Sequence, residues 1–331
     1  MSNLLILIPL FNDWTAVRRL LAELDVVLGA AGRRAGVLLV DDGSTDPAIG
    51  DRELVPAELN ALDRIVILRL RRNLGAQRAI AVGLAWVDSH VACDCVVVMD
   101  GDGEDRPQDV PRLLAEFERT GEKDVVFAER TKRSEGAWYT LMYALYRALH
   151  LMLTGERVRV GNFSVVPMPL LKRLVAVSDI WNHYAAGVFK SRIPYRTVPT
   201  SRGTRYSGRS HMNQVSLIAH GLSAMSVFGD RIGVRMLLAT TGIAAVTVAA
   251  LVTALMVRLL SGAGFPSWTP YGLVLAALVL FQAVTASLTF VFIILSARDT
   301  SSFIPLRDYV YFIAGVHEVL HAQPHELSVP R

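Results

Sequence analysis

Two clusters of acidic residues in this sequence each follow a short apolar run. The motif DDGS occupies residues 41–44 after Val37–Val40, and the motif DGDGED occupies residues 100–105 after Val96–Met99. Gathered carboxylates repel one another unless a cation or hydrogen-bond donors offset their charge, and Mg²⁺ or Mn²⁺ is commonly held by one or two carboxylates plus substrate phosphates. Either motif alone is an ordinary Asp-Gly turn. Together they predict a site for a divalent cation and a diphosphate.

An alternation of apolar runs and helical patterns over residues 1–200 predicts the elements that position these clusters. Short apolar runs predict strands at Leu4–Ile8, Val37–Val40, Ile65–Leu68, Val96–Met99 and Val125–Phe127. Apolar residues at helical spacing predict helices at Trp14–Leu28, Ala76–Val87 and Val110–Arg119. This order is typical of an α/β fold with a mostly parallel sheet covered by helices on both faces. Because ligands bind beyond the carboxyl ends of such strands, we expect both acidic clusters at one rim of the sheet.

Other phosphate and cation motifs do not occur in the sequence. It has no Gly-rich loop ending in Lys-Ser or Lys-Thr, and PLFND (residues 9–13) follows the first strand in place of G-x-G-x-x-G. A calcium-binding loop starting at Asp100 fails twice, because Asp105 stands where the loop needs Gly and Pro111 where it needs a bidentate Glu. These observations disfavour a nucleoside triphosphatase, a dinucleotide dehydrogenase and a calcium sensor.

The composition is too apolar for a wholly soluble chain. Of the 331 residues, 52% are apolar and only 19% are charged, and the mean hydropathy is +0.37. The net charge of +4 and the pI near 9.2 suit a membrane surface better than nucleic acid, since no basic run is long enough to track phosphates. We therefore expect a membrane as a partner and no nucleic acid.

Two uncharged runs near the C-terminus contain most of the apolar excess. Met236–Val257 has 22 residues and Tyr271–Ala297 has 27. At about 1.5 Å of rise per residue, either run is long enough to cross a hydrocarbon core of about 30 Å. We predict two transmembrane helices, at about 236–258 and 271–297. A pair of buried helices in a soluble core is the alternative, although such helices rarely reach 18 residues without a charge.

The flanking charges predict the orientation of these helices. The connector Ser261–Pro270 has no Lys or Arg, whereas four arginines lie outside the two runs: Arg231, Arg235, Arg298 and Arg307. Arg258 argues weakly against this assignment, because it ends the first run and would have to snorkel to the interface. We expect the connector on the far side of the membrane and both termini in the cytosol.

Four short motifs follow one another with consistent spacing: IPLFND (8–13), VDDGS (40–44), RNLGAQR (72–78) and MDGDGEDRP (99–107). They resemble motifs of the family 2 glycosyltransferases, which are inverting enzymes of GT-A fold. The resemblance implies a nucleotide-sugar donor bound by Pro9, Phe11, Asn12, Asp13, Asp41, Asp42, Asn73, Arg78, Asp100 and Gly101. It also implies that the fourth motif holds Mg²⁺ or Mn²⁺ through Asp100, Asp102 and Glu104.

A GT-A domain followed by two transmembrane helices is similar to the polyprenyl-phosphate glycosyltransferases of that family. These include dolichol-phosphate mannose synthases and bacterial enzymes that load undecaprenyl phosphate with one sugar. The resemblance implies that basic residues bind the acceptor and the phosphates, at Arg130, Arg133, Arg202 and Arg205. The motif TRYS (204–207) resembles the S-K-Y segment of these enzymes, and Arg205 can bind phosphate in place of Lys through its forked guanidinium.

Asn162 departs from the family pattern, because many relatives have an acidic residue after the preceding glycine, here Gly161. A sugar hydroxyl acceptor would need that carboxylate as a general base. A phosphate monoester has a second pKa near 6 and is already anionic at pH 7, so it needs little deprotonation. The substitution is therefore compatible with a lipid phosphate acceptor. We expect catalytic roles for four residues: Asp100, Asp102, Asn162 and Arg205.

These observations predict an inverting glycosyltransferase that moves one sugar to an undecaprenyl or dolichyl phosphate at the cytosolic face of a membrane, which we interpret as a bacterial inner membrane. UDP-sugars are the favoured donors and GDP-mannose is the second choice. The expected domains are a GT-A domain (1–206), an amphipathic juxtamembrane helix (207–230), two transmembrane helices (231–298) and a cytosolic tail (299–331). The juxtamembrane helix could instead pack on the catalytic domain. Small residues such as Gly242 and Ala249 permit close packing of spans, which leaves a homo-oligomer open.

Several alternative functions remain. Another lipid or a glycan is an alternative acceptor, and a non-catalytic binding protein could use the same fold. A processive polysaccharide synthase would need more spans and a Q-x-x-R-W motif, which the sequence does not have. HEVLH (317–321) matches the H-E-x-x-H pattern of zinc metalloproteases. If Tyr311–His321 were helical, His317 and His321 would face one side and His325 could add a third ligand. Zinc binding or proteolysis is the remote alternative.

Overall fold

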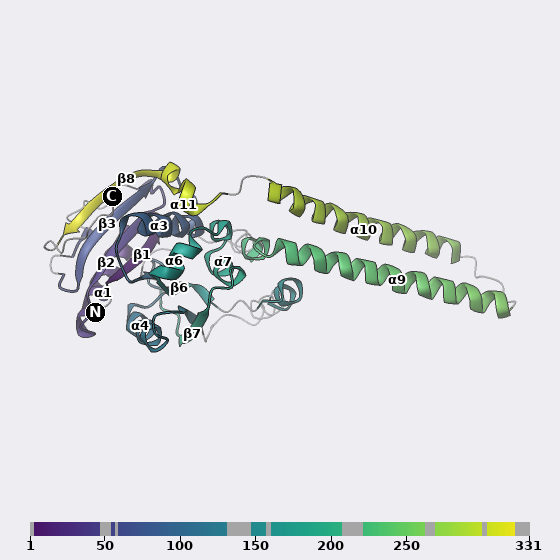
Figure 1. Ribbon diagram of the computed structural model, residues 1–331, viewed down its shortest axis with the longest axis horizontal. Coiled ribbons are helices and arrows are strands. Elements are labelled where there is room, and N and C mark those ends of the chain that lie inside the picture. The colour runs from purple at the N-terminus through teal and green to yellow at the C-terminus, as the bar shows by residue number, and fades with distance from the viewer. Residues whose placement is uncertain are drawn as a thin grey trace. The chain divides into compact units, whose positions relative to one another are not determined.

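The computed structural model describes residues 3–46, 54–56, 59–130, 147–156, 160–206, 221–261, 269–299 and 303–321. The chain divides into two compact units (Figure 1). The sheet unit consists of residues 1–140, 158–227 and 303–331, and the hairpin unit consists of residues 141–157 and 228–302. Several predictions fall outside the described residues: Arg133, His325, the side chain of Arg130 and residues 207–220 of the predicted juxtamembrane helix.

The sheet unit is built on an eight-stranded sheet with the order β7-β5-β6-β4-β1-β2-β3-β8 (Figure 1). The strands are β1 (Leu4–Leu10), β2 (Ala35–Asp41), β3 (Leu62–Leu70), β4 (Cys95–Val98), β5 (Val125–Arg130), β6 (Val160–Pro167), β7 (Tyr195–Thr200) and β8 (Ile313–His321). The four central strands β4, β1, β2 and β3 are parallel, as are β5 and β7. Strands β6 and β8 are antiparallel to their neighbours. The predicted mostly parallel α/β sheet is confirmed.

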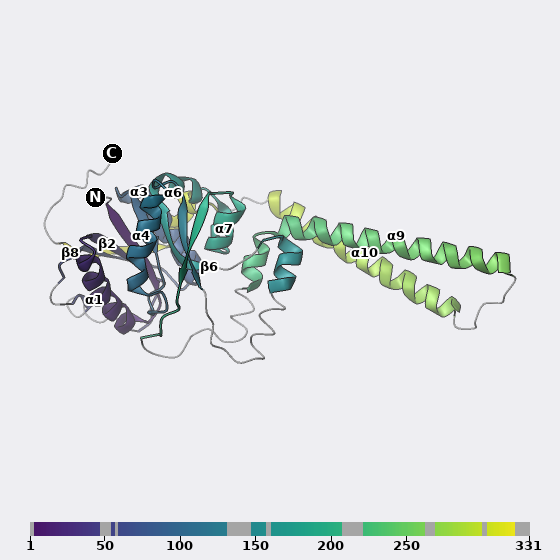
Figure 2. The same ribbon diagram turned by 90° about the horizontal axis from the view of Figure 1, so that it is seen from below.

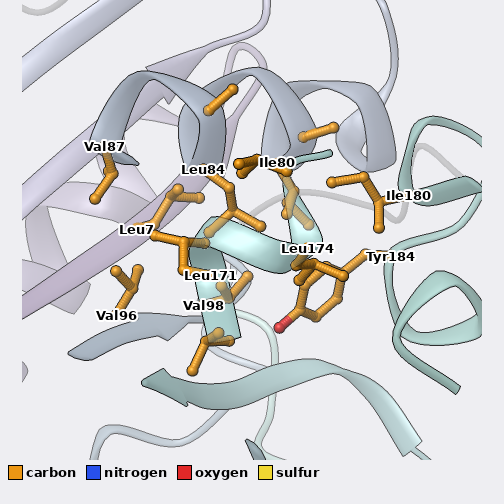
Figure 3. Close-up of a cluster of buried hydrophobic side chains, with 14 of the residues drawn as sticks. Leu7, Ile80, Leu84, Val87, Val96, Val98, Leu171, Leu174, Ile180 and Tyr184 are labelled. Atoms are coloured by element: carbon orange, nitrogen blue, oxygen red, sulfur yellow. The ribbon is translucent and has the colours of Figure 1, made fainter. Parts of the chain in front are cut away.

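Helices cover both faces of this sheet: α1 (Trp14–Ala30), α3 (Ala76–His90), α4 (Val110–Arg119), α6 (Met168–Leu174) and α7 (Tyr184–Lys190). Successive side chains of a strand point to opposite faces. Leu4, Ile6 and Ile8 of β1 therefore pack in one core with α1 and α4, whereas Leu5 and Leu7 pack in a second core with α3, α6 and α7. Figure 2 shows α1 and α4 beside the sheet. Figure 3 shows this second core, in which α3 and α6 contribute leucine side chains above β1 and β4.

After the second apolar helix, the chain returns to the sheet unit. The short helix α11 (Pro305–Asp308) precedes β8, which pairs with the edge of β3. The region that we expected to be a tail thus completes the sheet.

The metalloprotease interpretation required a helix over Tyr311–His321, and residues 313–321 form a strand instead. Residues 317 and 321 lie about 13 Å apart along a strand, which is too far for both to bind one zinc ion. Glu318 forms an ion pair with Arg64, with an N–O distance of 2.9 Å.

The hairpin unit contains two long apolar helices, α9 (Gly229–Ser261) and α10 (Thr269–Asp299). The predicted spans 236–258 and 271–297 lie within them. Both helices are long and apolar enough to cross a membrane, with mean hydropathies of 2.3 and 2.2 over their most apolar windows. Almost none of either window is buried, so the helices do not fit the alternative of a soluble core. Thr240 of α9 donates a hydrogen bond to Ser287 of α10 at 3.3 Å between the hydroxyl oxygens.

Helix α9 begins before the predicted span because its first turns bind a short neighbouring helix, residues 147–154. Arg231 forms an ion pair with Glu156 at 2.7 Å, and Arg235 donates to the carbonyl oxygen of Met152 at 2.8 Å. In the short helix the buried residues are the polar His150 and Thr154, while Leu149, Leu151 and Met152 are 39–66% exposed. This pattern is the reverse of the one that a helix on a soluble core shows.

Candidate active site

Most of the predicted donor-binding and metal-binding residues lie at the carboxyl ends of β1, β2 and β4, which are neighbours in the sheet. The loop Phe11–Asp13 follows β1, the loop Asp42–Ser44 follows β2, and the loop Met99–Asp105 follows β4. Because the three strands are parallel, their carboxyl ends share one rim. The structure thus brings the two acidic clusters to the same rim as the first loop.

Asn12 joins the first loop to the second. Its side-chain oxygen accepts the backbone N–H groups of Thr45 and Asp46 at 2.9 and 3.0 Å, and its own backbone N–H donates to the Ser44 hydroxyl at 3.0 Å. Its φ of 58° lies in the left-handed region, which Asn tolerates better than most residues. Asn12 therefore holds the loop after β1 and the loop after β2 together.

The two neighbouring carboxylates at the end of β2 have different partners. Asp41 accepts the Ser44 backbone N–H at 2.8 Å and forms an ion pair with Arg69 at 3.0 Å. Asp42 accepts the backbone N–H groups of Leu74 and Gly75, at 2.7 and 2.8 Å. Burial raises the pKa of the Asp42 carboxyl to about 6, although these two hydrogen bonds lower it. Asp42 was predicted to bind the donor, and in the structure its side chain holds the loop before α3.

The DGDGED motif forms a compact turn whose carboxylates are tied to its own backbone. Asp105 is buried and accepts the backbone N–H of Asp100 at 3.0 Å, and Asp102 accepts that of Glu104 at 3.0 Å. Burial raises the pKa of the Asp102 carboxyl, and the nearby charge of Glu104 raises it further, whereas the Arg205 guanidinium lowers it. The turn is therefore an electrostatically crowded site in which an additional positive charge would be favourable.

Residues 202–206 cross this turn and bring two arginines to it. Arg205 bridges Asp13 and Asp102, with N–O distances of 2.7 and 3.3 Å. Arg202 contacts both carboxylate oxygens of Glu104, with the closer contacts made by its Nη2 atom. The backbone adds two hydrogen bonds between the segments, from Gly203 to Glu104 and from Tyr206 to Asp102. Two of the four arginines predicted to bind the acceptor or the phosphates, Arg202 and Arg205, thus lie beside the acidic motif.

Tyr206 fixes the end of this segment. Its hydroxyl donates to Glu23 of α1 at 2.6 Å, and the guanidinium of Arg19 lies 4.3 Å from the centre of its ring. Burial raises the pKa of the Tyr206 hydroxyl. The ring lies against Gly103, where a Cβ atom would come within 2.5 Å of it and where φ is 89°. Only glycine fits this position of the motif.

Asn162, on β6, lies beside the DGDGED motif. Its amide nitrogen donates to Asp100 at 3.3 Å, and its amide oxygen accepts from Gln77 at 2.9 Å. Gln77, in the first turn of α3, was not among the predicted site residues. It lies within the motif RNLGAQR (72–78), but the motif alone does not show its role, because its partners come from β6 and from Tyr184 of α7.

The remaining predicted donor residues differ in their surroundings. Phe11 and Gly101 lie in the loops after β1 and β4, Pro9 is buried and pairs with Val40 in the sheet, and Asn73 is exposed. The guanidinium of Arg78 lies 5.2 Å from the centre of the Trp181 ring.

Comparison with known proteins defines the family. Residues 5–174 match the model named "Glycosyl transferase family 2". The chain belongs to this family. A family 2 domain therefore accounts for the strands and helices from β1 to α6, including both acidic clusters, and the expected resemblance is confirmed.

Two curated relatives are undecaprenyl-phosphate 4-deoxy-4-formamido-L-arabinose transferases from Klebsiella pneumoniae strains. They are 30% and 33% identical to this family 2 chain over 151 residues, which make up 46% of this chain and 44% of each relative. The match thus spans less than half of the relatives' length. Among solved structures, glucosyl-3-phosphoglycerate synthase from Mycobacterium tuberculosis, in complex with Mn²⁺, UDP-glucose and phosphoglyceric acid, has a TM-score of 0.50 at 17% identity and covers 70% of this chain and 80% of its own. This likeness concerns the GT-A fold.

Whether the family 2 site fits a divalent cation depends on its donor set. The described residues contain no group of three or more His, Cys, Asp or Glu side chains placed to hold a metal ion. Asp100 and Asp102 supply two carboxylates, while Glu104 is engaged by Arg202. Mg²⁺ is typically bound by one or two carboxylates together with substrate phosphates. The residues therefore fit a cation that arrives with a diphosphate.

Proposed function

We propose that this protein transfers a single sugar from a nucleotide sugar to a polyprenyl phosphate, with inversion at the anomeric carbon, at the cytosolic face of a membrane. UDP-sugars are the first choice of donor and GDP-mannose is the second. The observation that carries the proposal is the Arg205 guanidinium between Asp13 and Asp102. That guanidinium lies at the acidic rim of a family 2 domain, in a chain that also contains two apolar helices, and this supports a role for Arg205 in binding phosphate.

In the proposed reaction, an oxygen of the lipid phosphate forms a bond to the anomeric carbon while the bond from that carbon to the nucleoside diphosphate breaks. Mg²⁺ or Mn²⁺, held by Asp100 and Asp102, would supply Lewis acidity that offsets the charge of the leaving diphosphate. Asp41 and the loop shaped by Asn12 hold the nucleoside. Arg205 keeps its two carboxylate partners, contacts phosphate through its forked guanidinium and aligns the two anionic reactants, which lowers the entropic part of the barrier.

The amide at position 162 supports an acceptor that needs no general base. Asn162 donates a hydrogen bond to Asp100 and cannot take up a proton at neutral pH. A lipid phosphate is largely dianionic at pH 7 and can attack without losing a proton. The names of the curated relatives, which contain undecaprenyl phosphate as the acceptor, support the same choice.

The path of the chain supports a membrane hairpin with both ends on one side. The segment before α9 and the strand β8 after α10 both belong to the sheet unit. If α9 and α10 each cross a membrane, the chain must therefore leave and return on the same side. Exposed Leu149, Leu151 and Met152 on the short helix would be favourable in contact with lipid and unfavourable in water.

A transfer assay tests this proposal. The full-length protein in phospholipid vesicles is incubated with undecaprenyl phosphate, Mg²⁺ and, in separate reactions, a panel of UDP-sugars and GDP-mannose. We expect one donor class to give a lipid-linked monosaccharide, identified by its mass, with an inverted anomeric configuration by NMR. Asp100→Asn should reduce the rate at least 100-fold, since a metal ligand contributes several kcal/mol to such reactions.

Asp63→Asn is the matched control, because Asp63 is an exposed carboxylate whose ion pair with Arg34 is long, at 3.9 Å. This variant should keep the wild-type rate. Transfer to a glycan or to another lipid, with no polyprenyl-linked product from any donor, would refute the proposal that polyprenyl phosphate is the acceptor. Full activity of Asp100→Asn would refute the assignment of Asp100 to the active site.

A further inference from the structure

A chain of three hydrogen bonds connects the buried core of the sheet unit to the metal motif. The backbone N–H of Tyr184 donates to the Gln77 side-chain oxygen at 2.6 Å. The Gln77 side-chain nitrogen donates to the Asn162 side-chain oxygen at 2.9 Å, and the Asn162 nitrogen donates to Asp100 at 3.3 Å. One residue from each of α7, α3 and β6 is thus linked by hydrogen bonds to the carboxylate of Asp100 at the rim.

The chemistry of the two ends fixes the direction of this chain. A backbone N–H can only donate, so the oxygen of Gln77 must face Tyr184, and its nitrogen then faces Asn162. An ionised carboxylate can only accept, so the nitrogen of Asn162 must face Asp100. Both requirements give the same orientation of the two amides, and no donor faces another donor. Gln77 therefore presents a donor to the Asn162 oxygen and stabilises the same amide orientation that Asp100 requires.

The core end of the chain is rigid. Tyr184 is fully buried, and its hydroxyl lies 2.7 Å from the hydroxyl of Ser164, which is also buried. Ser164 donates its proton to the backbone carbonyl of Asn162 at 3.0 Å, so the Tyr184 hydroxyl is the donor to Ser164. Tyr184 thus holds Asn162 twice, through Gln77 to its side chain and through Ser164 to its backbone. The chain of hydrogen bonds therefore ends at Tyr184, which the buried core holds in place.

We propose that Gln77 is a positioning residue, which orients the Asn162 amide so that it donates to Asp100 and fixes the rotation of that carboxylate for the cation and diphosphate. This inference rests on the proposed function for its substrate, and on the three hydrogen bonds for its geometry. Gln77 itself touches neither Asp100 nor, in this proposal, the reacting atoms.

The decisive variant is Gln77→Glu, which has nearly the same shape. Glu still accepts from Tyr184 but cannot donate to Asn162, so the Asn162 oxygen faces either the new carboxylate or, after the amide turns, Asp100. Two acceptors then face each other. We expect kcat to fall about 10- to 100-fold, the range for losing a hydrogen bond to a charged group. The Mn²⁺ dissociation constant, measured from free Mn²⁺ by electron paramagnetic resonance in the presence of UDP, should rise by about tenfold or more.

Gln77→Leu removes both bonds of the side chain and serves as the comparison. If Gln77 only braced Tyr184, Gln77→Glu would behave like the wild type and Gln77→Leu would be worse. If Gln77 sets the direction of the Asn162 amide, Gln77→Glu is at least as impaired as Gln77→Leu, because it leaves two acceptors facing each other. Thermal unfolding of Gln77→Glu should stay within a few degrees of the wild type, which separates the effect from misfolding.

Gln108→Glu is the matched control, since Gln108 is exposed and lies outside the hydrogen-bond chain. It adds the same charge and should leave the rate and the Mn²⁺ dissociation constant unchanged. A Gln77→Glu protein whose kcat and Mn²⁺ affinity both stay within twofold of the wild type would overturn the inference. If the wild type binds Mn²⁺ but makes no polyprenyl-linked product, the proposed function fails, and the ratio of Mn²⁺ dissociation constants still decides the role of Gln77. A wild type that binds no Mn²⁺ would overturn both.

Discussion

Replacing Arg205 tests how much the acidic rim depends on one guanidinium. Arg205 reaches Asp13 and Asp102 at the same time, and all three side chains are about one-fifth exposed. A hydrogen bond to a charged group contributes about 1.5–3 kcal/mol. The lower value applies to each contact here, because the site is partly solvated and the Asp102 contact is long, at 3.3 Å.

Arg205→Gln removes the charge and should therefore cost about 3 kcal/mol, or roughly 100-fold in kcat/KM. Arg205→Lys keeps the charge but has a single ammonium group in place of the fork, so it should lose one contact and about tenfold. The assay is the initial rate of lipid-linked product at varied donor concentration. The loss should grow at low pH for Arg205→Gln, because the guanidinium lowers the pKa of Asp102 and its removal lets that carboxyl take up a proton more readily.

Arg196→Gln provides a matched control on the same unit. Arg196 also pairs with a carboxylate, Asp124, at 3.1 Å, but its side chain is 62% exposed. Exposed pairs contribute little, so this variant should change kcat/KM by less than twofold. If Arg205→Gln kept more than one-third of the wild-type kcat/KM, the Arg205 bridge between Asp13 and Asp102 would have no part in the reaction.

Three further predictions concern other features. The folded protein should hold a proton on Asp42 up to about pH 6, whereas the unfolded chain releases it near pH 3.8, so the contribution of Asp42 to stability declines as the pH rises from 4 to 6. Asp42→Asn should flatten the melting temperature over that range, and an unchanged pH profile would contradict the raised pKa. Gly103→Ala should displace Tyr206 and lower kcat by tenfold or more, which a rate assay and the quenching of tyrosine fluorescence can check. Removing residues 303–331 uncovers the edge of β3 and should cause aggregation on size-exclusion chromatography, and a monodisperse truncated protein would show that β8 is dispensable.

The sequence predicted the centre of the fold well because its signals there are local. The runs that became β1 and β2 are continuous and apolar, and the periodicity of α1 and α4 begins at the observed first residues. The acidic motifs directly follow their strands, so parallel topology alone was enough to place them at one rim.

Features that depend on distant partners were not predictable in this way. Strand β8 alternates small, polar and apolar residues without a clear period, and it exists because β3, about 250 residues earlier, offers an edge. The partners of Arg205 lie 103 and 192 residues away in the chain. Asp42 looks like a ligand-binding carboxylate by sequence, and only its two backbone hydrogen bonds show that it holds a loop. Gln77 lies in the motif RNLGAQR, but its role depends on partners in β6 and α7 that the motif does not show.

The position of β8 in the chain also has a consequence for biosynthesis. A ribosome completes α9 and α10 before it makes β8, and domains begin to fold as they emerge. The open edge of β3 can therefore be covered only after both apolar helices have been made. A nascent chain that stopped before α9 would contain the acidic residues of the rim but would expose the edge of β3, and an exposed edge promotes aggregation.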